Sequence, residues 1–376
     1  MPQTGNSGLC SPLRGRGLTG CGKTCYDVMP METRVIEVDL PGERASVYCE
    51  IAELLSQGKV VGLPTETVYG LGADAFCEEA VAEVFAVKER PHFDPLICHL
   101  PGAEELSSVA DVPEELQALV HKLAAEFWPG PMTLVLPRKA CVPDIVTSGL
   151  PTVACRVPRH EVMRGVARAL GRPIAAPSAN RFGHISPTSA QAVLKELGGR
   201  IPLVVDAGAC SEGLESTILQ PCLDEKGKPA VRLLREGPIT RERLRGICRV
   251  LRPGKDKTPA AQNPSAPGQL PSHYAPTKPL IIRDPREPFT PEDGVSYGLI
   301  SYQGNSPLTS QDCWEEVMAL SPGSGRLAEA AVRLFAVMRA MDELETVQVI
   351  VAEALPETGL GCAMMDRLRR AAADRS

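Results

Sequence analysis

Residues 17–24 read GLTGCGKT and match the phosphate-loop pattern G-x-x-x-x-G-K-[ST] at every fixed position. A working phosphate loop joins a buried strand to a helix, so that glycine N–H groups and the positive helix end meet the phosphate. Here no run of four apolar residues precedes the pattern, and Pro30 follows Thr24 by only six residues. The context argues against a phosphate-loop NTPase, an alternative that deletion of residues 1–28 would test. We expect residues 1–32 to form a tail that is disordered or that precedes the true start codon.

Four other clusters place polar residues beside apolar strands. The first is PTETVYGLGADA (64–75), in which Thr65, Glu66 and Thr67 follow a short apolar strand. Hydroxyl-rich strand ends are a usual place for ligand contact in α/β sheets. An ordinary turn explains the same residues equally well, so this stretch alone leaves both interpretations open.

The second cluster is KERPHFDPLICH (88–99), which joins the end of a helix to the start of a strand. Lys88 and Arg90 complement the negative end of a helix dipole in any such position. Because Pro91 stops the helix and the next strand starts at once, both cations are expected to point toward one strand-end edge. His99 lies in the strand, where a histidine is more often a satisfied core residue than a ligand contact.

The third and fourth clusters are TVACRVPRH (152–160) and APSANRFGHISPT (176–188). Strand alternation puts Val153, Cys155 and Val157 on one face, and Thr152, Ala154 and Arg156 on the other. A charged side chain on a half-buried strand needs an anionic partner, which is either an internal carboxylate or a bound ligand. The fourth cluster offers hydroxyl, amide and N–H donors suited to phosphate, although a plain loop has the same composition.

Short strands mixed with helices must position these clusters, and they indicate one α/β domain over 33–252 with a sheet of mixed direction. A Pro-rich linker follows over 253–279, with seven prolines in 27 residues. A small α/β domain over 280–376 closes the chain. The expected strands are 33–40, 59–64, 95–100, 132–137, 152–158, 173–177, 202–208, 216–220, 230–234, 278–284, 298–303 and 347–355. The expected helices are 43–58, 78–90, 113–127, 160–170, 188–198, 239–249, 326–344 and 362–373.

The composition of the 376-residue chain excludes several classes of protein. A net charge of −6 gives no general attraction to nucleic acid or to an anionic membrane, and 4% aromatic residues argue against stacking-based RNA binding. No stretch of 18 apolar residues exists, so we expect no membrane span. The 13 cysteines include no C-x-x-C pair, which leaves a zinc ribbon unsupported. Cys98 and Cys155 lie in apolar runs and are expected to be small core residues of a protein from the reducing cytoplasm.

Taken together, the motifs resemble those of YrdC-like threonylcarbamoyl-AMP synthases. They occur in the same order, as GLPTETVYGLGADA, K-x-R-P-x-x-x-P-L-x-x-H, FWPGPMT, an S-x-N run followed by SPT, GLESTIL and LLREGPI. The resemblance covers about 35–250 and extends through SHYAP and GLGCAMMDRLRRAA, as in the longer, two-domain form. It implies an α/β fold with a twisted open mixed sheet around a concave cavity, plus a small Rossmann-like α/β C-terminal domain.

The resemblance also implies an enzymatic function. The family condenses L-threonine, bicarbonate and ATP, with Mg²⁺, into threonylcarbamoyl-adenylate and releases pyrophosphate. The product passes to downstream tRNA threonylcarbamoyl transferase proteins, and a weak tRNA contact is compatible with this role. An RNA-binding module without catalysis is the alternative function. A carbamoyl-transfer maturation factor containing the same domain is another, but such proteins carry paired C-x-x-C motifs.

Site residues follow from the resemblance position by position. The catalytic positions are Lys88, Arg90, Ser178 and Asn180. The ATP positions are Arg90, Asp94, Thr152, Ser178, Ser186, Arg235 and Tyr274. The threonine positions are Thr67, His99, Arg156, Ala176 and Ser216, and no residue is expected to hold a metal. Asp94 stands where the family usually has asparagine, so it should repel phosphate unless Mg²⁺ or Arg90 intervenes. Residues 266–271 replace a more basic run, which weakens the expectation that the linker closes as a lid and that Tyr274 contacts nucleotide.

Overall fold

The structure is a computed structural model that describes residues 32–38, 44–91, 94–251 and 273–373. Contacts divide the chain into two units, residues 1–30 and residues 31–376, and all described residues belong to the second unit. The phosphate-loop pattern, nearly all of the predicted tail and most of the predicted linker therefore lie outside the described residues. None of the described helices is long and apolar enough to cross a membrane.

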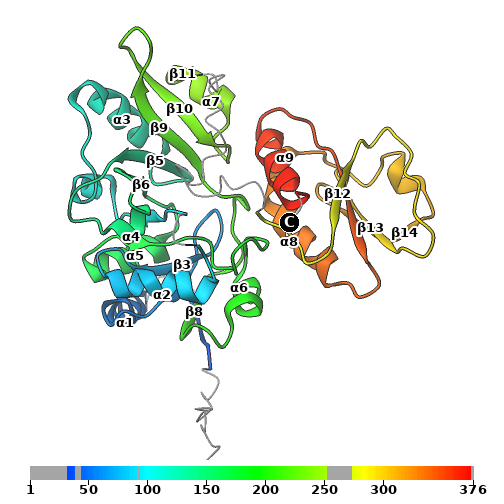
Figure 1. Cartoon of the computed structure of the whole chain (residues 1–376), viewed down its shortest axis with the longest axis horizontal. Coiled ribbons are helices and arrows are strands. Elements are labelled where there is room, and N and C mark those ends of the chain that lie inside the picture. Colours follow the sequence, from blue (N-terminus) through cyan, green and yellow to red (C-terminus); the bar gives the residue numbers. More distant parts are fainter. Residues whose placement is uncertain (1–31, 39–43, 92–93, 252–272, 374–376) are drawn as a thin grey trace, which may run out of the picture. The chain divides into compact units, whose positions relative to one another are not determined.

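Helices and strands alternate irregularly along the chain (Figure 1). The strands are β1 (Arg34–Glu37), β2 (Val61–Leu63), β3 (Gly70–Asp74), β4 (Ile97–His99), β5 (Met132–Pro137), β6 (Thr152–Arg156), β7 (Ile174–Ala175), β8 (Leu203–Asp206), β9 (Thr217–Leu223), β10 (Pro229–Arg235), β11 (Val250–Leu251), β12 (Leu280–Arg283), β13 (Tyr297–Ser301), β14 (Trp314–Ala319) and β15 (Val349–Glu353). The α-helices are α1 (Arg44–Ser56), α2 (Glu78–Lys88), α3 (Glu114–Phe127), α4 (Asp144–Thr147), α5 (Glu161–Leu170), α6 (Ala190–Leu197), α7 (Arg241–Arg245), α8 (Leu327–Glu343) and α9 (Leu360–Ala371). Short 3₁₀ helices cover Ala103–Ser108 and Leu308–Ser310.

The larger sheet has eleven strands in the order β1-β8-β2-β3-β7-β4-β6-β5-β9-β10-β11. Parallel and antiparallel pairs both occur: β4 and β6 run parallel, whereas β5 and β6 run antiparallel. The predicted sheet of mixed direction is therefore confirmed. Strand order departs strongly from chain order, so segments far apart in the sequence bring their ends to the same part of the sheet.

Strand β3 lies in a stretch that the sequence presents as a glycine-rich turn. All five of its residues are buried, and it pairs antiparallel with β2 and with β7. A Cβ atom on Gly72 would lie 2.8 Å from Leu63 Cδ1 and 3.0 Å from Ile174 Cγ2, so a larger residue would force a neighbouring side chain to shift. Close packing within the sheet, rather than a turn, explains this glycine.

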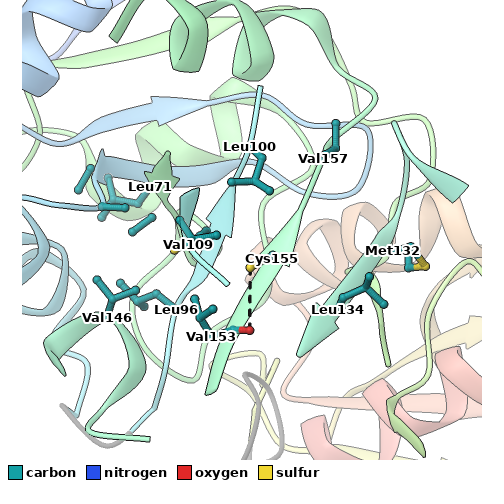
Figure 2. Close-up of a cluster of buried hydrophobic side chains, with 14 of the residues drawn as sticks. Leu71, Leu96, Leu100, Val109, Met132, Leu134, Val146, Val153, Cys155 and Val157 are labelled. Atoms are coloured by element: carbon teal, nitrogen blue, oxygen red, sulfur yellow. Dashed lines mark hydrogen bonds between the residues drawn. The ribbon is translucent and has the colours of Figure 1, made fainter. Parts of the chain in front are cut away.

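The main core confirms the alternation predicted for β6. Val153, Cys155 and Val157 are buried together with Leu134 and Leu96 (Figure 2). Burying apolar area of this kind contributes about 25 cal/mol per Å² to folding. Because one face of β6 is committed to this core, its opposite face is the one that carries Arg156.

The smaller sheet follows the linker and has the order β12-β15-β13-β14, with every pair parallel. Helices α8 and α9 pack against each other and cover this sheet, as expected for a parallel α/β unit (Figure 1). The strands and helices predicted for this part are present, but strand β14 was missed. None of its six residues is buried, as suits the edge of a sheet.

Candidate functional site

A cavity opens on the larger sheet, at the ends of strands from several parts of the chain. It collects nine of the residues predicted from sequence. They are Thr67, Arg90, His99, Arg156, Ala176, Ser178, Ser216, Arg235 and Tyr274. Because these residues span more than 200 positions of sequence, only the strand order of the sheet brings them together.

Arg156 pairs with an internal carboxylate, which is one of the two kinds of anionic partner that its sequence context allowed. Its Nη2 atom lies 2.7 Å from Glu66 Oε1, and both side chains are 3% exposed. Its Nη1 donates to Thr67 Oγ1 at 2.8 Å, and its Nε donates to the Gly130 carbonyl at 3.2 Å. Burial raises the pKa of Glu66, but the charge and hydrogen bond of Arg156 outweigh this and lower the pKa below its ordinary value. Glu66 is therefore a carboxylate, which fixes the guanidinium at the cavity wall.

The hydroxyl of Thr67 has a defined direction. Thr65 Oγ1 donates its single hydrogen to the Val68 carbonyl at 2.6 Å, so in the 2.8 Å contact between the two threonine hydroxyls Thr67 is the donor. The Thr67 oxygen accepts from Arg156. Arginine, two threonines and a backbone carbonyl thus form one ordered chain of hydrogen bonds along the cavity.

His99 is a neutral imidazole in this site. It is 3% exposed, and burial followed by the charge of Arg156 lowers its pKa to about 3. Its Nδ1 is buried and has no hydrogen-bond partner among the described residues. A core histidine normally has its polar atoms satisfied. His99 instead lines the cavity, and its unsatisfied Nδ1 is suited to a hydrogen bond with a ligand.

Lys88 does not line the cavity but supports one of its walls. Its Nζ donates to the Ser178 carbonyl at 2.6 Å and to the Asn180 carbonyl. The side chain is 1% exposed, and burial followed by the charge of Arg90 holds its pKa well below the usual range. Asn180 is buried behind the wall, where its Nδ2 donates to the carbonyls of Arg181 and His184. Lysine and asparagine together fix the backbone that carries Ser178.

Arg90 lines the cavity and is paired with Asp94. Its Nη2 lies 2.8 Å from Asp94 Oδ2, and it also donates to the carbonyls of Asp94 and Pro95. Burial raises the pKa of Asp94, and the neighbouring charges of Arg90, Lys88 and Arg235 oppose this rise. The Asp94 carboxylate is thus turned toward Arg90, and Asp94 is not among the residues that line the cavity.

Arg235 forms another cationic part of the wall. Its Nε donates to the Ser216 carbonyl and its Nη2 donates to Ser216 Oγ, both at 3.1 Å. Ser216 Oγ also lies 2.7 Å from Thr133 Oγ1. Burial lowers the pKa of Arg235, but an arginine stays protonated under all ordinary conditions.

Glu215 joins this cavity to the C-terminal part of the chain. Its Oε1 accepts from Ser186 Oγ at 2.5 Å, and its Oε2 accepts from Arg367 Nε of α9 at 3.0 Å. The Arg367 guanidinium lies 5.4 Å from the Tyr274 ring centre, and that ring stacks on Phe335 of α8. Sequence reasoning placed Ser186 and Tyr274 but missed Glu215 and Arg367, because 152 residues separate the two charges.

Tyr274 completes the wall in an unusual backbone conformation. Its φ is 64°, in the left-handed region that non-glycine residues seldom adopt. Burial, and then the charge of Glu215, raise the pKa of its phenol to about 12, and the hydroxyl has no partner among the described residues. His273 also lines the cavity and was given no role from sequence, although its SHYAP motif was noted.

Thr152 is the predicted site residue that the structure places farthest along the sheet. It is half-buried at the opposite end of β6 from Arg156, about 13 Å away at strand spacing. A ligand that touched both residues would need the length of a nucleotide. No group of three His, Cys, Asp or Glu side chains that could hold a metal occurs in the described part of the chain.

Two family profiles match consecutive parts of the sequence. The Sua5/YciO/YrdC profile, described as telomere recombination, matches residues 53–237. The profile described as threonylcarbamoyl-AMP synthase, C-terminal domain, matches residues 239–373. Together they cover every strand of both sheets except β1.

Relatives match over most of their length as well. Threonylcarbamoyl-AMP synthase of Pyrococcus abyssi is 38% identical over 340 residues, 85% of this chain and 92% of its own. The enzyme of Bacillus subtilis is 37% identical over 361 residues, 92% of this chain and 99% of its own. The crystal structure of P. abyssi Sua5 complexed with L-threonine is similar with a TM-score of 0.76 and 37% identity, covering 90% of this chain and 98% of that one. The chain therefore belongs to the threonylcarbamoyl-AMP synthase family, ATP-using nucleotidyltransferases of tRNA modification.

Proposed function

We propose that L-threonine, bicarbonate and Mg²⁺-bound ATP react in the cavity lined by Arg90, Arg156 and Arg235. The observation that carries this proposal is the meeting of these cations with buried polar atoms that have no partner in the described residues, His99 Nδ1 and Tyr274 Oη. Unpartnered buried donors and acceptors are costly to a folded protein, so a polar ligand is the natural occupant.

Threonine binds at the end of the cavity that Thr67, His99 and Arg156 line. Arg156 has N–H groups beyond those used by Glu66, Thr67 and Gly130, and a guanidinium matches a carboxylate geometrically. The neutral His99 ring accepts or donates one hydrogen bond without adding charge beside the amine. Ala176 and Ser216 also line the cavity, and their small side chains suit a small hydroxylated ligand.

The triphosphate lies toward Arg90, Arg235 and Ser178. ATP carries about four negative charges, which positioned cations stabilise as charge moves onto the leaving pyrophosphate. Lys88 contributes indirectly, because it holds the backbone of Ser178 and Asn180. Mg²⁺ arrives with the nucleotide and is bound mainly by phosphate oxygens, as its preference for substrate phosphates allows.

The chemistry needs no protein nucleophile. The threonine amine attacks CO₂ supplied by bicarbonate, loses a proton and becomes a carbamate. A carbamate oxygen then attacks the α-phosphorus of ATP, the bond to the β-phosphate oxygen breaks, and pyrophosphate leaves with the electron pair. Catalysis is then a matter of holding reactants in line and neutralising charge. The adenylate would pass to tRNA threonylcarbamoyl transferase proteins, and we place the enzyme in the cytoplasm.

The test is to incubate the full chain with ATP, Mg²⁺, bicarbonate and each amino acid in turn, and to measure pyrophosphate. We expect release that depends on both L-threonine and bicarbonate. Arg156→Lys should raise the KM for threonine by about tenfold or more, since it loses the paired hydrogen bonds to a carboxylate. Tight, salt-dependent tRNA binding without threonine-dependent pyrophosphate would replace the enzyme with an RNA-binding module.

A further inference from the structure

A second cavity lies in the C-terminal α/β part at one edge of the smaller sheet. Its lining comes from three segments, 284–286, 302–306 and 353–356. These segments directly follow β12, β13 and β15, which run parallel, so the cavity stands at the carboxyl ends of three adjacent strands. Ligands of open α/β sheets bind at this edge, where the strand order changes direction. Here β15 is inserted between β12 and β13, which creates such a change.

Glu353, the last residue of β15, is the buried charge of this cavity. It is 2% exposed, its Oε2 accepts from the Tyr302 N–H at 2.7 Å, and its Oε1 accepts from the Ser306 hydroxyl. No ion pair joins it to an arginine, lysine or histidine among the residues that the structure describes. Its carboxylate oxygens keep lone pairs beyond these two bonds, since each oxygen accepts two.

The other buried acids of the described residues are treated differently. Each has an arginine within ion-pair distance: Glu66 with Arg156, Asp74 with Arg172, Asp94 with Arg90, Glu196 with Arg339 and Glu215 with Arg367. A buried carboxylate without a cation is costly, and the described residues otherwise include none. Glu353 is therefore the exception, and it faces a cavity large enough to admit its missing partner.

We propose that this cavity binds a small molecule with a protonated amino group, for which Glu353 is the counter-ion. An anion is disfavoured by Glu353 and by Asp284 at the same edge. A metal ion is disfavoured because no group of three possible ligands occurs in the described chain. Arg286, paired with Asp284 and with 85% of its side chain exposed, stands at the mouth, where it can meet the carboxylate of a free amino acid. A polyamine offers the same ammonium without that carboxylate.

The experiment is hydrogen–deuterium exchange of the full chain with millimolar L-threonine, L-lysine, ethanolamine or spermidine. A ligand on Glu353 should slow exchange in the segments 302–306 and 353–356 of the wild type. Glu353→Gln keeps the shape but removes the charge; its amide oxygen can accept from the Tyr302 N–H and its NH₂ can donate to the Ser306 hydroxyl. Binding should therefore weaken by about tenfold or more. Glu345→Gln, an exposed acid of the same domain, is the matched control and should bind as the wild type does.

The probes distinguish the two sources of the ammonium. If L-threonine or L-lysine slows exchange in the wild type but not in Arg286→Gln, the ligand is an amino acid. If spermidine or ethanolamine slows exchange in both the wild type and Arg286→Gln, the ligand is an amine without a carboxylate. Unchanged exchange in both segments with every probe overturns the proposal, as does equal binding to Glu353→Gln and wild type. Neither outcome bears on the catalytic cavity, which pyrophosphate release tests separately.

Discussion

Arg367→Met is the substitution that most directly tests how the C-terminal part supports the catalytic cavity. Methionine keeps the apolar stem of the side chain but leaves Glu215 buried with the Ser186 hydroxyl as its remaining hydrogen-bond partner. Removing one partner of a buried ion pair costs about 3–5 kcal/mol, because the other charge stays desolvated. Since the guanidinium also faces the Tyr274 ring, we expect the KM for ATP to rise about tenfold while the KM for threonine changes less.

The chain offers separate probes for the stability measurement. Its two tryptophans, Trp128 and Trp314, lie in the larger and the smaller sheet regions. In variants that retain only one tryptophan, its fluorescence reports the urea unfolding of the region in which it lies. The two regions can then be measured separately, without assuming a single transition for a two-domain protein. Arg369→Met is the matched control. Arg369 pairs with Glu357 on the exposed side of α9, where such a pair contributes less than about 1 kcal/mol.

A double-mutant cycle separates the pair from the individual side chains. Glu215→Gln combined with Arg367→Met removes both charges, so it should be less destabilised than the two single changes predict, with a coupling of about 2 kcal/mol or more. The reasoning is refuted if Arg367→Met unfolds like Arg369→Met and the coupling falls within error of zero. An unchanged KM for ATP would confine Arg367 to a role in stability.

Four further predictions concern the catalytic cavity and the tail. Lys88→Met should lower the free energy of unfolding by about 2–3 kcal/mol, because two buried carbonyls lose their donor, and unchanged urea unfolding would contradict this role. Asp94→Asn should lower the KM for ATP about threefold, because no carboxylate then offsets the positive charge of Arg90. A higher KM would mean that Asp94 positions Arg90. The pKa of His99 is about 3 in the folded protein and 6.5 in the unfolded chain, so the unfolded chain binds a proton first on acidification. The free energy of unfolding should therefore fall below pH 6.5 by up to about 1.4 kcal/mol per pH unit. His99→Gln should flatten this slope when unfolding is measured from neutral to acid pH. Deleting residues 1–28 should leave threonine-dependent pyrophosphate release unchanged, and its loss would restore the phosphate-loop interpretation.

The sequence predicted most helices and strands because their apolar periods are regular. It missed β3 because glycine and alanine carry no β-strand preference, and what makes Gly70–Asp74 a strand is pairing with β2 and β7 on both sides. It missed β14 because an edge strand does not need the buried, alternating face that identifies a strand.

The cavity residues were predictable only where a motif keeps them together along the chain. Alternation in β6 correctly put Arg156 opposite the core, but whether its partner was Glu66 or a ligand depended on which strand lies beside it. The same limit applies to Lys88, which was expected to point toward the strand-end edge together with Arg90, whereas its Nζ donates to the backbone carbonyls of Ser178 and Asn180. A partner from another domain, such as Arg367, leaves no local pattern at all.

Helix α9 begins close to the second cavity in the sequence and carries Arg367, which pairs with Glu215 of the first cavity, although no α9 residue lines either cavity. The helix starts at Leu360, four residues after Pro356, which lines the second cavity. Arg367, which pairs with Glu215, lies about 10 Å farther along the helix axis. A helix of this length moves as a rod, so a ligand that shifts its first turn also shifts the arginine. Thermodynamic reciprocity then requires that any occupant which tightens nucleotide binding is itself held more tightly once nucleotide has bound.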